Sequence, residues 1–236
     1  GNKQTNAGTY TVTVALDDKD NPVWNDGTTE DKEYSFVIYK ADYVLETVPT
    51  PKTGLIYKGE GQNLISAGTA TGGTMQYSLN CVSWSPDIPS AIDAGEYTVY
   101  YKIAGNENYN GSEADSFTVN IAKKQLTVTE VAATSRDYIA NDKTVDITGI
   151  TLSGIQGTDD VSVKITGLKG TLSSANADTY TSVTLPTLTL INDDKENYVL
   201  VQPTSAVATN VTINKLNPTI TLTVQTSITK TYGAEI

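Results

Sequence analysis

Two acidic clusters contain the residues best suited to metal chemistry in this sequence. They are Asp17-Asp18-Lys19-Asp20 and Asn192-Asp193-Asp194-Lys195-Glu196. Oxygen atoms at this density could bind Ca²⁺, which takes about six to eight oxygen ligands. Each cluster also contains a lysine, neither has the spacing of an EF-hand, and both occupy the same polar turn of an internal repeat. We therefore interpret both clusters as solvated turns, and we predict no metal site and no cofactor.

The usual components of a catalytic centre are missing or poorly placed. The sequence has no histidine, which excludes Ser–His and Cys–His pairs. Cys81 is the single cysteine, and no Lys or Arg lies within ten positions of it to stabilise a thiolate. We expect a buried, free thiol there. Paired carboxylates could in principle cleave glycosides, but the expected loops are short and leave little room for a deep cleft. We predict that the chain is not an enzyme and has no catalytic residues.

Aromatic residues in turns are the one indication of a binding site. Trp24, Trp84 and Tyr109 lie in or beside expected turns, where an exposed ring could stack on a sugar or on a partner protein. They are the candidate ligand-stacking residues, and glycans or proteins of host or cell surfaces are the candidate partners. The alternative is that these rings pack against the ends of hairpins. Rings that line a groove would favour binding, whereas rings folded against hairpin ends would favour a structural role.

The net charge restricts the class of partner. Lys and Arg number 16 and Asp and Glu number 27, which gives a net charge of −11 and a pI near 4.4. A nucleic-acid partner is disfavoured, because binding to phosphates requires clustered Lys and Arg. No apolar run of 18 residues occurs, so we expect no membrane insertion in this segment.

Hydrophobic alternation predicts an all-β fold of short antiparallel strands. Val, Thr and Ile are abundant in the alternating runs, and β-branched residues favour pleated strands. Clusters of Gly, Asn and Asp separate the runs and favour turns. The residues expected to share one face of a strand are Tyr10, Val12, Val14 and Leu16; Tyr34, Phe36 and Ile38; Tyr97, Val99, Tyr101 and Ile103; Phe117, Val119 and Ile121; Leu126 and Val128; Val161, Val163 and Ile165; Val207, Val211 and Ile213; and Ile220, Leu222 and Val224.

An internal repeat is visible along the chain. The motif Ala7-Gly8-Thr9-Tyr10 returns as Ala94-Gly95-Glu96-Tyr97 and, more weakly, as Ala177-Asp178-Thr179-Tyr180. Each copy is followed by a polar turn with a shared asparagine and then by a strand that ends in lysine. A further tyrosine opens each unit. The asparagines are Asn21, Asn108 and Asn197, the lysines are Lys40, Lys123 and Lys215, and the opening tyrosines are Tyr57, Tyr138 and Tyr232.

These anchors predict tandem immunoglobulin-like antiparallel β-sandwich modules, since their spacing of roughly 80–95 residues is close to the size of that fold. We predict the C-terminal part of a module at 1–41, whole modules at 42–122 and 123–215, and the first strand of a following module at 216–236. The sequence is expected to be part of a longer chain. The strand around Thr219–Val224 is expected to pair with another element, such as the 1–41 segment of a second chain.

The repeated tyrosine has a specific expected role. In immunoglobulin-like sandwiches, a tyrosine at the start of a late strand bonds its hydroxyl to the backbone of the corner before it. The segment from Asp93 to Tyr97 has this form. Where antibody domains place a cysteine two residues later, this chain has Val12, Val99 and Ser182. The core is therefore expected to hold without a disulfide between its sheets.

The motifs of the two whole modules resemble known bacterial repeats. Module 42–122 carries Gly54-Leu55-Ile56-Tyr57-Lys58-Gly59 and Gly72-Gly73-Thr74-Met75-Gln76-Tyr77-Ser78, and it resembles the MBG-type Ig-like repeats of large surface proteins. Module 123–215 is similar to the related YDG-type repeat through Arg136-Asp137-Tyr138 and Glu196-Asn197-Tyr198-Val199-Leu200.

The resemblance implies a function and a location, both of which are expectations. It implies a non-catalytic structural or spacer region of a bacterial secreted or cell-surface protein. The alternative is an adhesin or a carbohydrate-binding module. The location implied is extracellular or at the bacterial cell surface. These families bring no catalytic, cofactor-binding or metal-binding residues to the sequence.

Overall fold

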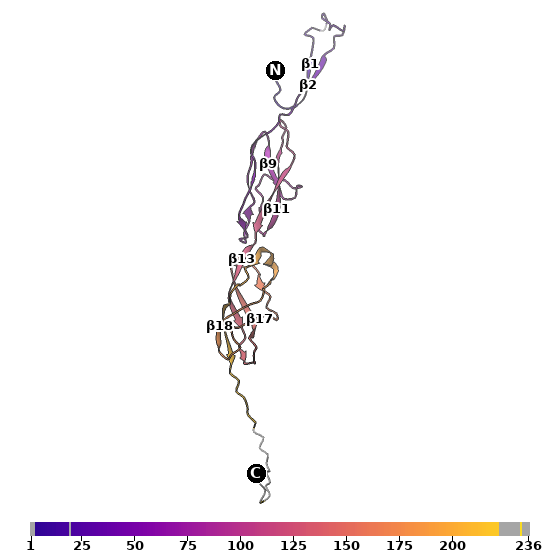
Figure 1. The fold of residues 1–236 in the computed structure, drawn as a ribbon. Coiled ribbons are helices and arrows are strands. Elements are labelled where there is room, and N and C mark those ends of the chain that lie inside the picture. The colour runs from indigo at the N-terminus through magenta and orange to yellow at the C-terminus, as the bar shows by residue number, and fades with distance from the viewer. Residues whose placement is uncertain (1–2, 19, 222–231, 233–236) are drawn as a thin grey trace. The chain divides into compact units, whose positions relative to one another are not determined.

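The structure is a computed structural model, and it describes residues 3–18, 20–221 and 232. The described chain is nearly all β, in agreement with the prediction (Figure 1). Its one helical element is the short 3-10 helix η1 (Asp193–Asn197). Among the described residues, no helix is long and apolar enough to cross a membrane.

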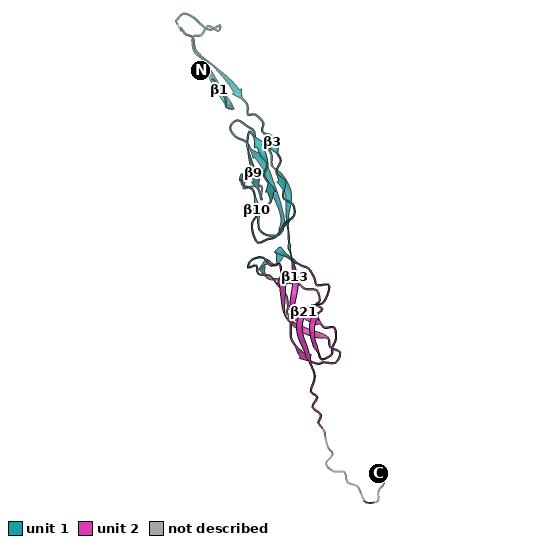
Figure 2. Ribbon diagram, turned by 90° about the vertical axis from the view of Figure 1, so that its left-hand side faces the viewer, with its two compact units in different colours: residues 1–125, 156–160, 193–199 teal, residues 126–155, 161–192, 200–236 magenta. Residues whose placement is uncertain are grey.

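The chain divides into two compact units (Figure 2). The first unit contains residues 1–125, 156–160 and 193–199, and the second contains residues 126–155, 161–192 and 200–236. Two short segments from within 123–215 are therefore part of the first unit. The division of the sequence into modules at 1–41, 42–122, 123–215 and 216–236 stays a prediction.

Short strands form the first unit. A hairpin of β1 and β2 is one two-stranded sheet, and a four-stranded sheet has the order β5-β12-β11-β9. Three further two-stranded sheets of the unit are β3–β8, β4–β7 and β10–β6. The strands are β1 (Gly8–Val14), β2 (Lys32–Ile38), β3 (Val44–Thr47), β4 (Thr50–Pro51), β5 (Leu55–Ile56), β6 (Gln62–Asn63), β7 (Ile65–Ser66), β8 (Thr69–Thr71), β9 (Thr74–Ser78), β10 (Ser90–Ala91), β11 (Gly95–Ala104) and β12 (Asp115–Ala122).

The remaining strands form three further sheets. Their orders are β17-β15-β13-β20, β14-β21-β18 and β16-β19. Pairing of β13 with β15 contains two shifts of register, and such bulges bend a strand and increase its twist. The strands are β13 (Lys124–Ala133), β14 (Arg136–Asp137), β15 (Thr144–Ser153), β16 (Ser162–Val163), β17 (Lys169–Thr171), β18 (Thr179–Val183), β19 (Leu190–Ile191), β20 (Tyr198–Leu200) and β21 (Val207–Asn214).

The predicted alternation produces the core of each unit. On β11 and β12 the buried residues include Val99, Ile103, Val119 and Ile121, which confirms the expected faces of these strands. The second unit has one continuous buried cluster, drawn from β13, β15, β18, β21 and the loops between them. Its members are Val131, Val145, Ile147, Leu172, Tyr180, Val183, Val211 and Ile213.

The hairpin of β1 and β2 differs from the other sheets, because no third strand pairs with it among the described residues. Tyr10 and Val12 lie opposite Phe36 and Tyr34 in the register, as the predicted faces require. The rings of Tyr10 and Phe36 are in contact, with centroids 5.5 Å apart. Even so, Phe36 is 40% exposed and Tyr34 is 60% exposed. An isolated two-stranded hairpin is at best marginally stable in water.

The tyrosine corners are present in all three copies of the repeat. In each, the hydroxyl of the tyrosine donates a hydrogen bond to the carbonyl oxygen four residues earlier, as predicted. This bond fixes the backbone where it turns into the strand. The three bonds are Tyr10 to Asn6, Tyr97 to Asp93 and Tyr180 to Asn176, each 2.8 Å long.

A parallel strand pairing also recurs, and the sequence did not predict it. We call the strand that precedes the shared lysine of each unit its closing strand. The closing strand β12 pairs with β5, so that Ile121 and Ala122 lie beside Leu55 and Ile56. The closing strand β21 pairs with β14 in the same way. In both cases the backbone N–H of the opening tyrosine continues the ladder. These bonds are Tyr57 N–H to the Ala122 carbonyl, 2.9 Å, and Tyr138 N–H to the Asn214 carbonyl, 3.0 Å.

The predicted strand around Thr219–Val224 is described only in part. Residues 219–221 form no strand, and Ile220 is 79% exposed. Leu222 and Val224, which complete its expected face, lie outside the described residues.

The tyrosine corner can be tested by removing one hydroxyl. We expect Tyr97→Phe to lower the free energy of unfolding by about 1 kcal/mol, the usual contribution of one hydrogen bond. Urea unfolding measures this change. Tyr100→Phe on the same strand is the control, because the Tyr100 hydroxyl has no hydrogen-bond partner among the described residues. An equal loss in both variants would contradict the assigned role.

Candidate functional site

Trp24 lies in the loop between β1 and β2. Its indole N–H donates to the carbonyl of Glu30 at 2.6 Å, which holds the half-buried ring against its own loop. The ring lines a shallow, open hollow together with Val23, Asn25, Asp26, Lys32 and Tyr34. Asp26 and Lys32 form an ion pair in it, and the hydrogen bond from Lys32 is the main cause that lowers the pKa of Asp26 to about 2. The hollow therefore combines two aromatic rings with a fixed ion pair.

Trp84 and Tyr109 both have contacts within the first unit. Trp84 lies in the loop between β9 and β10, and the ammonium of Lys102 lies 4.2 Å from its ring centroid. This distance is typical of a cation–π interaction. Tyr109 packs on the backbone of Gly72, where a Cβ atom would come within 2.4 Å of the tyrosine ring. Gly72 also has a φ of +88°, so both the ring and the backbone favour glycine there.

The three candidate aromatics do not form one platform. Each belongs to a different loop of the first unit, and none of the ring-to-ring contacts among the described residues joins any two of them. The partners of Trp84 and Tyr109 come from their own unit. Trp24 is the one of the three that lines a hollow with a second aromatic residue.

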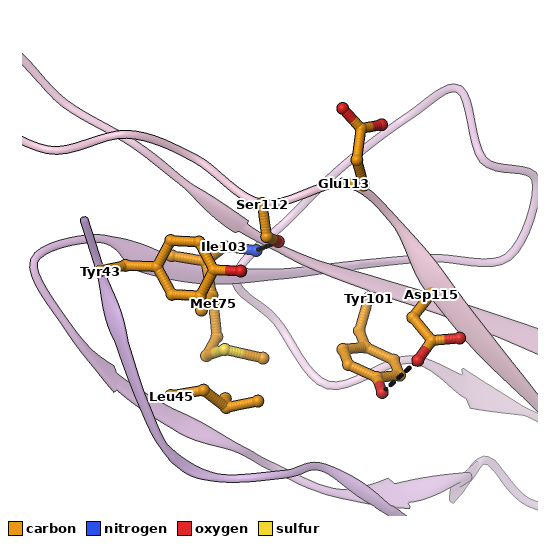
Figure 3. Close-up of a pocket in the computed structure, with 8 residues that line it drawn as sticks. All are labelled: Tyr43, Leu45, Met75, Tyr101, Ile103, Ser112, Glu113 and Asp115. Atoms are coloured by element: carbon orange, nitrogen blue, oxygen red, sulfur yellow. Dashed lines mark hydrogen bonds between the residues drawn. The ribbon is translucent and has the colours of Figure 1, made fainter.

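A small pocket in the first unit was not expected from the sequence (Figure 3). It has a volume of about 160 Å³, which is below the roughly 300–1,000 Å³ of most small-molecule sites. In Figure 3 the carboxylate of Glu113 points away from Met75 and Leu45. The lining residues are Tyr43, Leu45, Met75, Tyr101, Ile103, Ser112, Glu113 and Asp115.

The polar groups of this pocket bind one another. The hydroxyl of Tyr101 donates to Asp115 at 2.9 Å, and the Ser112 hydroxyl oxygen accepts the backbone N–H of Ile103 at 2.7 Å. Burial and the hydrogen bond to Asp115 raise the pKa of Tyr101. Tyr101 is thus a neutral hydrogen-bond donor at ordinary pH, and the pocket provides an apolar surface more than a reactive group.

Carboxylates of the acidic clusters are used within the fold. Asp18 accepts hydrogen bonds from the backbone N–H of Asp20 and the side chain of Asn21, and the bond from Asn21 is the main cause that lowers its pKa. Asp194 accepts the backbone N–H of Asp160 at 2.7 Å. Within residues 3–18, 20–221 and 232, no group of three or more Cys, Asp or Glu is placed to hold a metal ion.

The prediction of a buried thiol at Cys81 is wrong. Cys81 is exposed and has a φ of 58°. The cause lies in the residue before it, since the side-chain oxygen of Asn80 accepts the backbone N–H groups of Val82 and Ser83, each at 2.9 Å. This tight turn carries the chain out of β9 and leaves the thiol in solvent.

The shared asparagines of the repeat make the same contact twice. Asn197 accepts the backbone N–H of Ala94 at 2.8 Å and donates to the side chain of Asp93 at 3.1 Å. Asn108 accepts the N–H of Ala7 at 2.7 Å and donates to the side chain of Asn6 at 3.2 Å. We call each of these an asparagine contact. Residues 193–199 belong to the first compact unit, so both contacts lie within it.

The lysines at the strand ends reinforce the asparagine contacts. Lys40 donates to the carbonyl of Asn106 at 2.7 Å, and Lys123 binds Glu196 at 3.0 Å. In both cases the lysine reaches the polar turn that carries the asparagine. The corner motif, the asparagine turn and the terminal lysine of the repeat therefore meet in one place.

A second cluster in the first unit centres on Asp159. One carboxylate oxygen of Asp159 accepts the hydroxyls of Tyr57 at 2.7 Å and Tyr198 at 2.5 Å. The two rings meet edge to face with centroids 5.3 Å apart, an arrangement that aromatic pairs favour. Both tyrosines are at least 97% buried. The Tyr198 hydroxyl also accepts the backbone N–H of Gln156 at 2.8 Å.

The titration of this cluster indicates a structural role. Burial, followed by the hydrogen bond to Asp159, raises the pKa of Tyr198 to about 12. The same causes raise the pKa of Tyr57. Neither phenol would act as a base near neutral pH, because a general base functions best with a pKa near the working pH.

The sequence contained partial signals for the residues of the asparagine contacts and of the Asp159 cluster, although it predicted neither. Tyr57 and Tyr198 both belong to repeat motifs, and the shared asparagines were visible as a pattern. Their contact partners, Asp159 and the corner residues Asp93 and Ala94, lie about 40 to 104 positions away. Contacts over such separations are not encoded in local periodicity.

Stability at high pH tests the cluster around Asp159. Because the pKa of Tyr198 is raised above its ordinary value of 10.0, its contribution to stability is complete below pH 10 and is lost as the pH rises towards about 12. We expect Tyr198→Phe to unfold with a weaker dependence on pH across this window, measured by urea unfolding at several pH values.

The control for this experiment is Tyr39→Phe, since Tyr39 is 84% exposed. That substitution should leave the pH dependence unchanged. An unaltered profile in Tyr198→Phe would contradict the assignment.

Comparison with known proteins supports part of the sequence prediction. Residues 122–206 match the YDG domain, although Tyr138-Ile139-Ala140 stands where the namesake Tyr-Asp-Gly is expected. No match was found among the curated proteins. The MBG-type assignment of residues 42–122 stays a prediction. The comparison therefore finds similarity to the YDG domain over most of the region predicted as a YDG-type module.

Proposed function

We propose that this chain is a non-catalytic structural region, a spacer built of tandem immunoglobulin-like β-sandwich modules in a bacterial secreted or cell-surface protein. The observation that carries the proposal is the asparagine contact, which occurs twice with the same geometry. In each contact, the shared asparagine of one repeat binds the corner motif of the repeat before it. Contacts of this kind suit a chain that serves as a structural spacer.

Three features support the immunoglobulin-like sandwich. The first is the tyrosine corner, found in three copies and characteristic of that fold. The second is the division of strands β3 to β12 into a four-stranded sheet and several shorter antiparallel pairs. The third is the parallel pairing of each closing strand with a short opening strand. Residues 122–206 match the YDG domain, in agreement with the YDG-type resemblance from which the bacterial origin is proposed.

Scattering from dilute solutions of the chain tests the proposed spacer function. The junction from Ile121 to Leu126 contains neither Gly nor Ser, and a junction of this kind restricts bending. We expect an extended particle with a narrow distribution of shapes. Asn197→Ala removes both hydrogen bonds of its asparagine contact and should widen that distribution.

The matched control for this substitution is Asn120→Ala, because Asn120 lies on the exposed side of β12. Its scattering profile should equal that of the unaltered chain. Modules that lie side by side in the unaltered chain would refute the spacer.

The second candidate function is carbohydrate or surface-protein binding, and the hollow around Trp24 favours it. Trp24 and Tyr34 line this hollow with the ion pair of Asp26 and Lys32, a combination that could stack on and hydrogen-bond a sugar. Under the spacer proposal, we expect no binding on a glycan array. Binding that disappears in Trp24→Ala and persists in Trp84→Ala would instead establish the second function.

A further inference from the structure

The pocket lined by Tyr43, Leu45 and Met75 has a buried apolar base. Met75 is 9% exposed and Ile103 is 3% exposed, and both side chains line the pocket. Leu45 lines it as well and is 38% exposed. We call Met75 and Ile103 the base of the pocket. Atoms that face an unfilled space lack dispersion contacts, so an apolar group seated on the base would supply them.

The volume of the pocket restricts the size of that group. At about 160 Å³, it is close to the roughly 150 Å³ of an engineered cavity that binds benzene. It therefore has room for one ring or one branched apolar side chain. Most sites for free small molecules are larger, at about 300–1,000 Å³. A side chain that anchors a larger partner suits this space better, because protein interfaces concentrate binding energy in such buried anchors.

Two carboxylates lie at the exposed side of the pocket, and we call them the acidic rim. Glu113 and Asp115 are both exposed, and Figure 3 shows them apart from Leu45 and Met75. None of the residues that line the pocket is Lys or Arg. Glu113 forms neither a hydrogen bond nor an ion pair with any residue that the structure describes. The acidic rim therefore offers negative charge to a partner.

The lysine of β11 is directed to the other face of the sheet. Lys102 lies between Tyr101 and Ile103, and successive side chains of a strand point to opposite faces. Its ammonium lies over the ring of Trp84, 4.2 Å from the ring centroid. This lysine is therefore engaged elsewhere and does not neutralise the acidic rim.

Asp115 keeps the capacity for a further donor. One of its carboxylate oxygens accepts the hydroxyl of Tyr101 at 2.9 Å, and the other accepts the backbone N–H of Ser116 at 2.7 Å. An ionised carboxylate has about four lone-pair sites, so each oxygen can accept one more hydrogen bond. The two existing bonds hold the carboxylate in place. The acidic rim can therefore accept the N–H groups of a cation without losing contacts within the unit.

We propose that this pocket binds a basic polypeptide. One apolar side chain of the partner, such as leucine, sits on the base, and a neighbouring lysine or arginine binds the acidic rim. The charges favour this occupant, because two carboxylates in a chain with a net charge of −11 repel an acidic partner or a second copy of the chain. The proposal is independent of the spacer function and of the hollow around Trp24.

A label on Met75 gives a direct test. Met75 is the single methionine of the sequence, so an isotope-labelled methionine methyl group gives one NMR signal, and that signal comes from the base of the pocket. The probe is the capped tripeptide Lys-Leu-Lys, which has an apolar side chain between two cations. We expect it to shift the signal, with saturation in the millimolar range, because a single anchor with flanking charges buries little area.

Two further tripeptides are the controls for this probe. Lys-Ser-Lys lacks the apolar anchor, and Glu-Leu-Glu reverses the charges. Each should bind at least about tenfold more weakly than Lys-Leu-Lys. The absence of a shift with Lys-Leu-Lys, or a control peptide that binds as tightly as the probe, would overturn the proposal.

A charge reversal tests the acidic rim. Glu113→Lys should raise the dissociation constant of Lys-Leu-Lys about tenfold, because the cation then meets a like charge. The matched control is Glu96→Lys, which makes the same change of net charge at an exposed position of β11 that does not line the pocket. Equal weakening by both variants would mean that net charge alone attracts the peptide, and it would refute the site.

A second substitution tests the apolar part of the pocket. Leu45→Ser removes apolar surface beside the base and should raise the same dissociation constant about fivefold. Leu79→Ser is the matched control, since Leu79 is 44% exposed and does not line the pocket. All four substitutions lie at exposed positions, so the fold should persist, which thermal unfolding measures. Unaltered binding by Leu45→Ser would place the peptide elsewhere and contradict the proposal.

Discussion

The backbone corner ahead of each repeated tyrosine is the point on which the rest of this structure depends. Its carbonyl accepts the tyrosine hydroxyl, and in two of the three copies its N–H is bound by an asparagine from a distant turn. Buried or partly buried backbone groups are costly when they lack partners. The two N–H groups bound by asparagine are partly buried, so their pairing avoids this cost. The hydrogen bond of the tyrosine is exposed in two copies and partly buried in the third.

Much of the fold follows from local patterns in the sequence. Alternation identifies the buried faces of β11 and β12 because the period of a strand is two residues. The tyrosine corner is predictable because both of its partners lie within five residues. The short parallel strands β5 and β14 are two residues long, too short for any alternation to reveal them. Their positions depend instead on where the closing strand ends.

The candidate site shows the same division between local and long-range information. The turns that carry Trp24, Trp84 and Tyr109 were predictable, whereas Lys102 beside Trp84 and Gly72 beneath Tyr109 come from other strands or loops. Cys81 was assigned to the interior by composition alone, since cysteine is usually buried. The hydrogen bonds that Asn80 accepts from Val82 and Ser83 hold the turn in which this thiol is exposed.

The exposed thiol of Cys81 has a practical consequence for work on this chain. The sequence holds one cysteine, so a maleimide dye, spin label or surface tether would attach at a single known position without any substitution. That position lies in the loop after β9, where the thiol is exposed. Fluorescence or force measurements could therefore use a label or tether attached to the folded protein at Cys81 alone.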